Sequence, residues 1–397
     1  MILTQIEYIL VFAGLIMLFR VIYYHRSISK RLSDTKTIPK LKKYPSVSIL
    51  RPIKGLDAGI RGNVQNALNP GYPGNVETIF IFDDDKDEAY PLVKEEIETF
   101  KIKNPTVNAN ILFSGNPPKN RTGKLNAMIK GYEVAKNELI AIADSDTRND
   151  RKLLTKLVET LESDPKAGSA FVPVIVSESF QTIGDAGYAL MLNGLYTPEA
   201  KSNASKHGWE MPFIMGQFML FKREAIDKIG GFETAEGQLV DDMYIGRRVH
   251  EEGLKNLVCP NQIKIIQYGL SIKDFWKIYI KWITFSRSGL PGLTFKLGPW
   301  IRGMVFWFSL IFSVASFLMG YQLAGIINGL VTLAVSQSIN MLHQDAGGAQ
   351  IKFRHSWVSF GILLIAPIVY SQILMKQEVT WRGRVYNLNS DSKLSTK

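Results

Sequence analysis

Cysteine and histidine are scarce in this sequence: Cys259 stands alone among 397 residues, and there are five histidines. A single cysteine excludes an intrachain disulfide and a metal site built from several cysteines. The histidines are scattered and lack the spacing of a histidine metal site. The scarcity of cysteine is also typical of a reducing compartment, so we expect the middle of the chain to face the cytoplasm.

Acidic residues are also in short supply, because Lys and Arg outnumber Asp and Glu and leave a formal net charge of +11. A basic chain can bind nucleic acid, an anionic membrane surface or phosphorylated small molecules. No nucleic-acid-binding motif is present, and many basic residues lie beside the apolar ends of the chain. This placement favours a membrane and argues against nucleic acid as a partner.

Long apolar runs are absent from the middle of the chain and occur at its two ends. The first run, Ile2 to Tyr24, has about the ~20 residues needed to span a bilayer. No basic segment precedes it and no small-residue cleavage site follows it, so we interpret residues 1–25 as a membrane anchor rather than a cleaved signal peptide. Lysines and arginines come next, so the positive-inside rule predicts that the chain then enters the cytoplasm.

Three more apolar runs predict about three membrane spans within residues 299–376: Pro299–Gly320, Leu323–Met341 and Trp357–Met375. Three spans would place the tail, residues 377–397, outside, which conflicts with Arg382 and Arg384. Before these runs, residues 271–298 mix aromatic and basic side chains, a composition typical of helices at a membrane surface. A helix buried against the soluble domain fits that pattern equally well.

Residues 45–270 alternate short apolar runs with helical stretches. This order predicts an α/β fold with a largely parallel sheet. Ligands of such sheets bind beyond the carboxyl ends of the strands, and acidic clusters follow two of the expected strands. The expected strands of this sheet include Val47–Leu50, Thr78–Phe82, Ile111–Phe113 and Leu139–Ala143.

Asp144 and Asp146 directly follow the last of these strands. One or two carboxylates together with phosphate oxygens suit Mg²⁺ or Mn²⁺, which would neutralise a diphosphate leaving group. Asp146 can equally cap the helix that begins near Arg151, so the pair alone is a weak signal. A second cluster, Asp83 to Asp85 with Asp87 beyond it, follows another strand. A carboxylate there can contact uracil or ribose, and a solvated acidic turn is the alternative.

Three further segments carry candidate functional residues. Asp241 and Asp242 open a helical stretch, where a carboxylate can act as general base or simply favour the first helical turn. Gly216 can allow a ligand to approach the backbone closely, or it marks a bend. Lys124 lies at a helix start and can reach a phosphate, although the glycine spacing of a P-loop is absent.

Taken in order, these segments resemble the ceramide glucosyltransferases, glycosyltransferase family 21, and their relatives in the larger family 2. The similarity runs from about Pro45 to Gly289, with a further match at Thr380–Tyr386. It implies an α/β fold of the GT-A type, which binds nucleotide-sugars, with its catalytic face in the cytoplasm. The supporting segments are Arg51-Pro52-Ile53-Lys54-Gly55-Leu56-Asp57, of which Pro52 is a candidate substrate contact, Gly131–Lys136 and the Gly-Gly-Phe at 230–232.

The family motif has three aspartate positions followed by (Q/R)xxRW. The resemblance places the first on the Asp84 to Asp87 cluster, with Asp84 the expected nucleotide contact and Asp87 the better match to the motif position. It places the second on Asp144. It places the third, the catalytic base, on Asp242, and the final tryptophan on Trp282.

The sequence departs from the motif in two places. Lys281 replaces the arginine before the tryptophan, and Ile278 replaces the Gln/Arg position. Lysine keeps the charge but lacks the planar fork that grips a phosphate at two points. Lys277 or Arg287 is a candidate to compensate.

The resemblance therefore implies an inverting transfer of a sugar, with glucose the first choice, from a UDP-sugar to the hydroxyl of a membrane lipid such as ceramide. Asp144 and Asp146 would hold Mn²⁺ or Mg²⁺, Asp242 would take the acceptor proton, and Lys281 with Trp282 would lie near the acceptor and the departing diphosphate. Diacylglycerol, a hopanoid lipid or a polysaccharide are alternative acceptors. A non-catalytic membrane protein that binds nucleotide-sugars is the alternative from another class.

Overall fold

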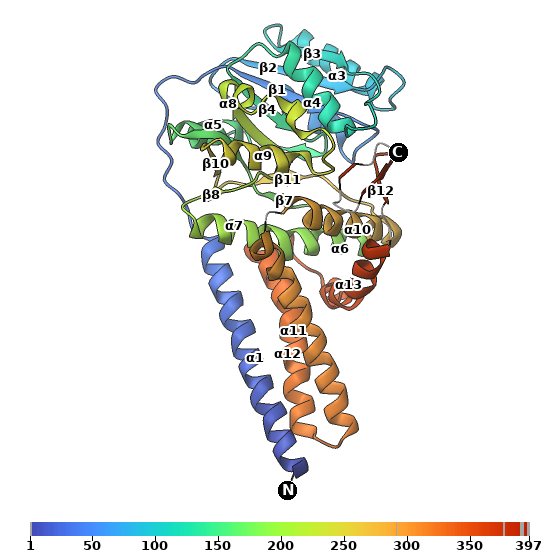
Figure 1. Ribbon diagram of the computed structural model, residues 1–397. Coiled ribbons are helices and arrows are strands. Elements are labelled where there is room, and N and C mark those ends of the chain that lie inside the picture. Colours follow the sequence, from blue (N-terminus) through green and yellow to red (C-terminus); the bar gives the residue numbers. More distant parts are fainter. Residues whose placement is uncertain (1, 291, 376–377, 390–392, 395–397) are drawn as a thin grey trace.

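The computed structural model describes the chain except residues 1, 291, 376–377, 390–392 and 395–397. An α/β domain lies at one end of the molecule, and long helices extend from it (Figure 1). The expected end of the membrane segment, at residue 376, and the last residues of the tail lie outside the described part.

An eight-stranded sheet forms the centre of the α/β domain. In sheet order its strands are β3 (Asn108–Phe113), β2 (Val76–Phe82), β1 (Val47–Pro52), β4 (Leu139–Ala143), β9 (Phe218–Lys222), β6 (Ala167–Phe171), β10 (Lys255–Val258) and β8 (Glu210–Met211). Six of these strands run in one direction, which confirms the prediction of a largely parallel sheet. The antiparallel strands β9 and β8 were not expected.

Helices cover both faces of this sheet. Alternate side chains of β2 reveal the two faces: Ile79 and Ile81 belong to the larger core cluster, and Phe80 and Phe82 belong to a smaller one. Because both faces are buried, β4 is a continuous apolar run rather than an alternating one. The helices of the domain are α2 (Ile60–Leu68), α3 (Tyr90–Lys103), α4 (Gly123–Val134), α5 (Leu153–Glu162), α8 (Arg223–Lys228) and α9 (Asp241–Glu251), with a 3-10 turn η2 (Phe232–Ala235).

A layer of helices separates the α/β domain from the long helices (Figure 1). It contains α6 (Ile183–Met191), the π-helix η1 (Leu192–Tyr196), α7 (Thr197–Lys206) and α10 (Ile272–Gly289), beside a small sheet of β5 (Thr147–Arg148), β11 (Ile263–Ile265) and β7 (Val174–Val176). Ser271 and Asp274 form a capping box that starts α10. Phe275, Tyr279 and Ile283, spaced by four residues, are its buried side. Ile272, in the first turn of the same face, is exposed.

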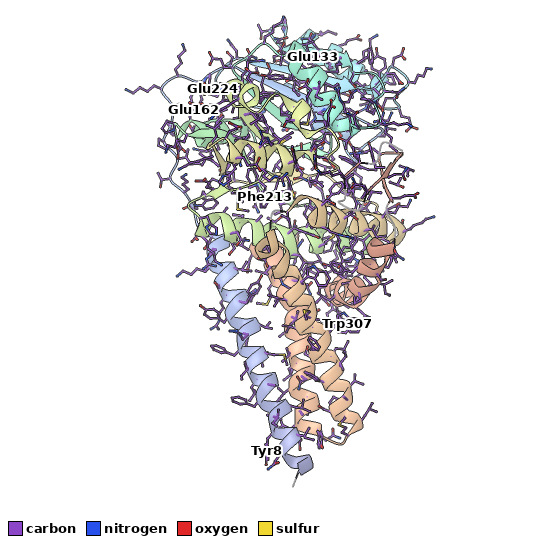
Figure 2. The ribbon with its side chains drawn as sticks, viewed as in Figure 1. Tyr8, Glu133, Glu162, Phe213, Glu224 and Trp307 are labelled. Atoms are coloured by element: carbon purple, nitrogen blue, oxygen red, sulfur yellow. The ribbon has the colours of Figure 1, made fainter. Side chains whose placement is uncertain are left out.

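Three long helices lie side by side below this layer: α1 (Ile2–Leu32), α11 (Gly292–Leu318) and α12 (Gln322–Asp345). The 24 residues of α12 extend about 36 Å, which exceeds the ~30 Å hydrocarbon core of a bilayer. Large apolar side chains remain exposed along the bundle, such as Tyr8 on α1 (Figure 2). Among the described residues, four helices could cross a membrane by length and composition: these three and the segment Phe353–Gln372.

The fourth candidate, α13 (Val358–Met375), does not run alongside the full length of the bundle. Ser359 near its start bonds to Ser336 of α12 at 3.0 Å, and Gln372 near its end accepts a hydrogen bond from Trp276 of α10 at 3.2 Å. Both ends therefore lie toward the α/β domain (Figure 1). The short 3-10 helix η3 (Phe353–His355) precedes it.

After α13 the chain returns to the α/β domain as a hairpin of β12 (Glu378–Trp381) and β13 (Arg384–Asn387). Arg382 and Arg384 of the hairpin pair with Asp57 and Asp83, so the tail and the α/β domain lie together. The expectation that three C-terminal spans place the tail outside, away from a cytoplasmic domain, does not fit these contacts.

Candidate active site

One large cavity, with a volume of about 1220 Å³, lies between the α/β domain, α10 and the C-terminal hairpin. It lies beyond the ends of the parallel strands β1, β2 and β4, where ligands of such sheets bind. Most of the predicted site residues line it: Pro52, Lys124, Asp144, Asp146, Asp241, Asp242, Lys281, Trp282 and Arg287.

The turn after β4 carries Asp144 and Asp146, and buried groups hold its backbone. The Arg51 guanidinium, itself buried, donates to the carbonyl of Thr147 at 2.6 Å and to that of Ser145 at 3.2 Å. Asn63 donates to the same Ser145 carbonyl at 3.1 Å. These contacts fix the turn through the carbonyls of Ser145 and Thr147 and do not use the carboxylates of the two aspartates.

The Asp146 carboxylate carries a buried oxygen, Oδ1, that has no hydrogen-bond partner among the described residues. Burial, with the neighbouring charges of Asp144 and Asp57, raises the pKa of Asp146 to about 6. A buried, unpaired acceptor is costly, and a divalent cation would satisfy it. The described residues hold no cluster of three or more His, Cys, Asp or Glu side chains that could bind a metal. The two carboxylates therefore fit a cation that takes its other ligands from phosphate and water.

Lys124 lies at the centre of the acidic groups. Thr122 caps α4, and this places Lys124 in the first turn, where its ammonium pairs with Asp144 and donates to the Gly216 carbonyl at 2.8 Å. Burial alone would lower the pKa of Lys124, but Asp144, Asp241 and Asp242 together raise it. The side chain is therefore a permanent cation in contact with the Asp144 carboxylate.

Asp241 and Asp242 begin α9, and they have different surroundings. Asp241 accepts hydrogen bonds from the Thr122 hydroxyl at 2.9 Å and from the Asp242 backbone N–H at 2.8 Å. Asp242 faces the cavity, and burial together with the charge of Asp241 raises its pKa to about 7. A carboxyl group with that pKa is suited to exchange a proton near neutral pH.

Position 216 requires a glycine because the Asp242 side chain packs directly on it. A Cβ at this position would lie 2.7 Å from the Asp242 Cβ and 2.8 Å from its Cγ. The group that approaches Gly216 closely is the Asp242 side chain, whereas the expected group was a ligand, and Gly216 itself does not line the cavity.

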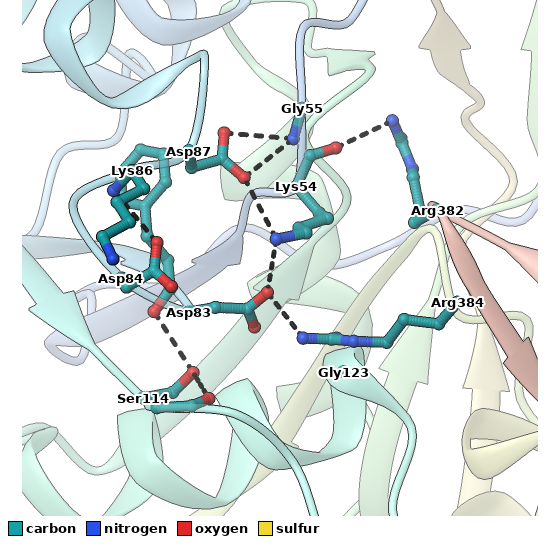
Figure 3. Close-up of polar contacts among 12 residues, drawn as sticks. Lys54, Gly55, Asp83, Asp84, Lys86, Asp87, Ser114, Gly123, Arg382 and Arg384 are labelled. Carbon is teal, nitrogen blue, oxygen red and sulfur yellow. Dashed lines mark hydrogen bonds and ion pairs between the residues drawn. The ribbon is translucent and has the colours of Figure 1, made fainter.

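The acidic cluster after β2 is used differently from the expectation (Figure 3). Asp83 lines the cavity and pairs with Lys54 at 2.8 Å and with Arg384 at 2.7 Å. The predicted residues do not line it: Asp87 is buried and accepts from the Gly55 backbone N–H at 3.0 Å, and Asp84 accepts from Lys86 within its own turn. Consecutive carboxylates point in different directions, which the sequence pattern does not reveal.

Helix α10 supplies the aromatic and cationic wall. Trp282 packs against Tyr196 of η1 with a distance of 5.3 Å between ring centroids. The Lys281 ammonium lies 5.7 Å from the ring centre of Trp381 in the hairpin. Burial and the nearby charge of Arg382 lower the pKa of Lys281 to about 8.

The C-terminal hairpin covers the cavity, a role that we did not predict. Arg382 pairs with Asp57 and donates to the Lys54 carbonyl at 3.2 Å, and Arg384 reaches Asp83 (Figure 3). Tyr386 accepts a hydrogen bond from the Gly123 backbone N–H at 3.2 Å. The match at Thr380–Tyr386 was the one signal in the sequence that could have drawn attention to this segment.

The fold and the cavity together define a glycosyltransferase of the GT-A type. A mannosyltransferase from Pyrobaculum calidifontis, PcManGT, solved in complex with GDP-Man and Mn²⁺, superposes with a TM-score of 0.50 at 17% sequence identity, covering 94% of this chain and 99% of that one. The family model described as glycosyl transferase family 21 matches residues 9–394. The chain belongs to glycosyltransferase family 21.

Two curated relatives come from Caenorhabditis elegans. Ceramide glucosyltransferase 3 is 24% identical over 87% of this chain and 73% of its own length. Ceramide glucosyltransferase 1 is 21% identical over 97% of this chain and 80% of its own length. The similarity therefore includes the membrane-type helices as well as the α/β domain.

Proposed function

We propose that this protein is an inverting glycosyltransferase that moves a sugar, with glucose as the first candidate, from a UDP-sugar to the hydroxyl of a membrane lipid such as ceramide. The observation that carries the proposal is the position of Asp242, a carboxyl group with a pKa of about 7, in the same cavity as Asp144 and Asp146. The names of the relatives favour ceramide and glucose.

A divalent cation is part of this proposal. Its support is the unpaired Asp146 Oδ1 and the Mn²⁺ complex of the structurally similar mannosyltransferase. Asp144 and Asp146 would hold the ion, and the bound ion would supply positive charge to the diphosphate of the donor. Lys124, in contact with Asp144, adds a second positive charge on the same side.

Asp242 acts as general base in the proposed transfer. Its carboxylate takes the proton of the acceptor hydroxyl, and the acceptor oxygen bonds to the anomeric carbon. The bond from that carbon to the diphosphate breaks, and UDP leaves with the electron pair. A single displacement of this kind inverts the anomeric configuration. Lys281 and Arg382 lie near Asp146 and add positive charge on the leaving-group side.

We also propose that α1, α11 and α12 cross the bilayer and that α13 lies at the membrane surface. This arrangement places the α/β domain and the C-terminal hairpin on one side. The basic residues near the end of α1, including Arg26, Lys30 and Arg31, support the cytoplasm as that side.

The decisive experiment measures lipid product by mass spectrometry after purified protein is incubated with a panel of UDP-sugars and mixed lipids, with Mn²⁺ or with a chelator. The Asp242→Asn variant should lose about 10²–10⁴ in transfer rate while remaining folded. Near-normal transfer by that variant would exclude Asp242 as the base. If the wild type neither transfers sugar nor hydrolyses any UDP-sugar in the presence of metal, the protein is a non-catalytic binding protein.

A further inference from the structure

The cavity extends from the aspartates to the long helices. At that end it is lined by apolar residues of α11, namely Trp300, Ile301 and Met304, together with Leu290 before that helix and Tyr370 of α13. The three α11 side chains are 48%, 54% and 50% exposed, so the described chain covers this wall only in part, with Trp300 packed against Tyr370. The cavity thus combines carboxylates at one end with a half-exposed apolar wall beside the membrane-type helices at the other.

One acidic side chain belongs to this second half of the cavity. Glu199 of α7 lines the large cavity and also a smaller neighbouring pocket of about 250 Å³ between α1 and α7. Both hydrogen bonds that it accepts within the described residues, from Tyr24 and from Arg302 at 3.0 Å, go to the same oxygen, Oε1. The second oxygen, Oε2, is therefore the acceptor that Glu199 can offer to a ligand.

Arg302 fixes the position of this carboxylate. It is buried on α11, pairs with Glu199, and donates to the Gly194 carbonyl of η1 at 3.0 Å. A charged residue in an apolar helix is costly unless it is paired, and such residues often mark functional sites. The pair holds one carboxylate beside α11, in the same cavity as Asp242.

We propose that the acceptor enters the cavity sideways from the bilayer along Trp300, Ile301 and Met304, and that Glu199 binds hydrogen-bond donors of its headgroup. This inference rests on the proposed function, because the acceptor hydroxyl must reach Asp242. The expected acceptor is a lipid whose uncharged headgroup carries hydroxyl or amide N–H donors, and whose chain remains partly in the membrane against α11.

The test compares Ile301→Trp, which fills the apolar wall, with Ile311→Trp as the matched control. Ile311 lies on the same helix, is 52% exposed and does not line the cavity. Transfer is measured to a long-chain ceramide in nanodiscs and to the same headgroup on a short, water-soluble chain. Ile301→Trp should raise KM for the long-chain acceptor by about tenfold or more. The control and the KM for the UDP-sugar should stay at wild-type values.

The headgroup contact is tested with Glu199→Gln, which keeps the hydrogen bonds at Oε1 but removes the charge. The KM for both acceptors should rise by about ten- to hundredfold, while hydrolysis of the UDP-sugar by water is unchanged. Glu133→Gln is the matched control, because it makes the same substitution in an exposed pair with Lys130 and Glu133 does not line the cavity. It should leave both acceptor KM values near wild type.

Three results would overturn the inference. Ile301→Trp could behave like its control, Glu199→Gln could leave both acceptor KM values at those of Glu133→Gln, or Glu199→Gln could impair hydrolysis and transfer equally. These outcomes differ from failure of the proposed function, in which the wild type itself makes no glycolipid and both proposals fall.

Discussion

The contact between Gly216 and Asp242 allows the position of the proposed base to be tested without altering its chemistry. Gly216→Ala adds one methyl group whose carbon would lie 2.7 Å from the Asp242 Cβ. Ordinary contacts begin at 3.4 Å, so the Asp242 side chain must move by about 0.7 Å. Because its Cβ and Cγ are both too close, rotating the carboxylate end alone does not relieve the overlap.

A displacement of this size should be visible mainly in the chemical step. Misplacing a catalytic group by about 1 Å can cost about 10²-fold in rate, equivalent to ~2.7 kcal/mol at 25 °C. We expect Gly216→Ala to lower kcat by about that factor, with KM for the UDP-sugar little changed because Asp242 acts on the acceptor. The assay is steady-state transfer to a lipid acceptor, with thermal unfolding of the same preparations.

Gly303→Ala is the matched control, because an added Cβ there meets nothing within 4 Å and Gly303 does not line the cavity. It should keep wild-type kcat. If Gly216→Ala also keeps kcat within about threefold of wild type, Asp242 either is not the base or does not need this position, and the reasoning fails.

Two further predictions follow from charges in the cavity. The pH profile of kcat/KM should be bell-shaped, rising as Asp242 loses its proton near pH 7 and falling as Lys281 loses its own near pH 8. Lys281→Met should remove the fall at alkaline pH. An unchanged fall in that variant would show that Lys281 is not the group that titrates there. Arg384→Gln breaks the pair with Asp83 and should raise KM for the UDP-sugar by about tenfold. Its control, Arg247→Gln, breaks an exposed pair with Glu251 on α9 and should leave KM for the UDP-sugar unchanged. Equal KM values for the two variants would contradict a role of the hairpin in binding the UDP-sugar.

The sequence predicted the parts of the site that depend on local order. A buried strand followed by a turn fixes where Asp144 and Asp146 must lie, and Asp242 at a helix start follows from the pattern around it. These positions can be predicted from local order alone, because each aspartate directly follows a strand or begins a helix.

The features of the fold and of the site that the sequence did not predict depend on contacts between distant segments. Asp83 rather than Asp84 or Asp87 lines the cavity because Lys54 and Arg384 reach it, and Arg384 is 301 residues away in the chain. The antiparallel β9 is inserted between β4 and β6 by pairing that has no local signal. Likewise, α13 has the composition of a span, and only its contacts with α10 and α12 show where it lies.

The hairpin that covers the cavity has a consequence for the biosynthesis of the protein. A ribosome makes β1 and β2 early, and it makes Arg382 and Arg384 only after α11 and α12. Asp57 and Asp83 therefore gain their arginine partners last, when both long helices already exist. The arginines can reach these aspartates only if the helices have brought the chain back to the side of the α/β domain. If α11 and α12 cross the bilayer as proposed, completion of the candidate active site depends on their correct insertion.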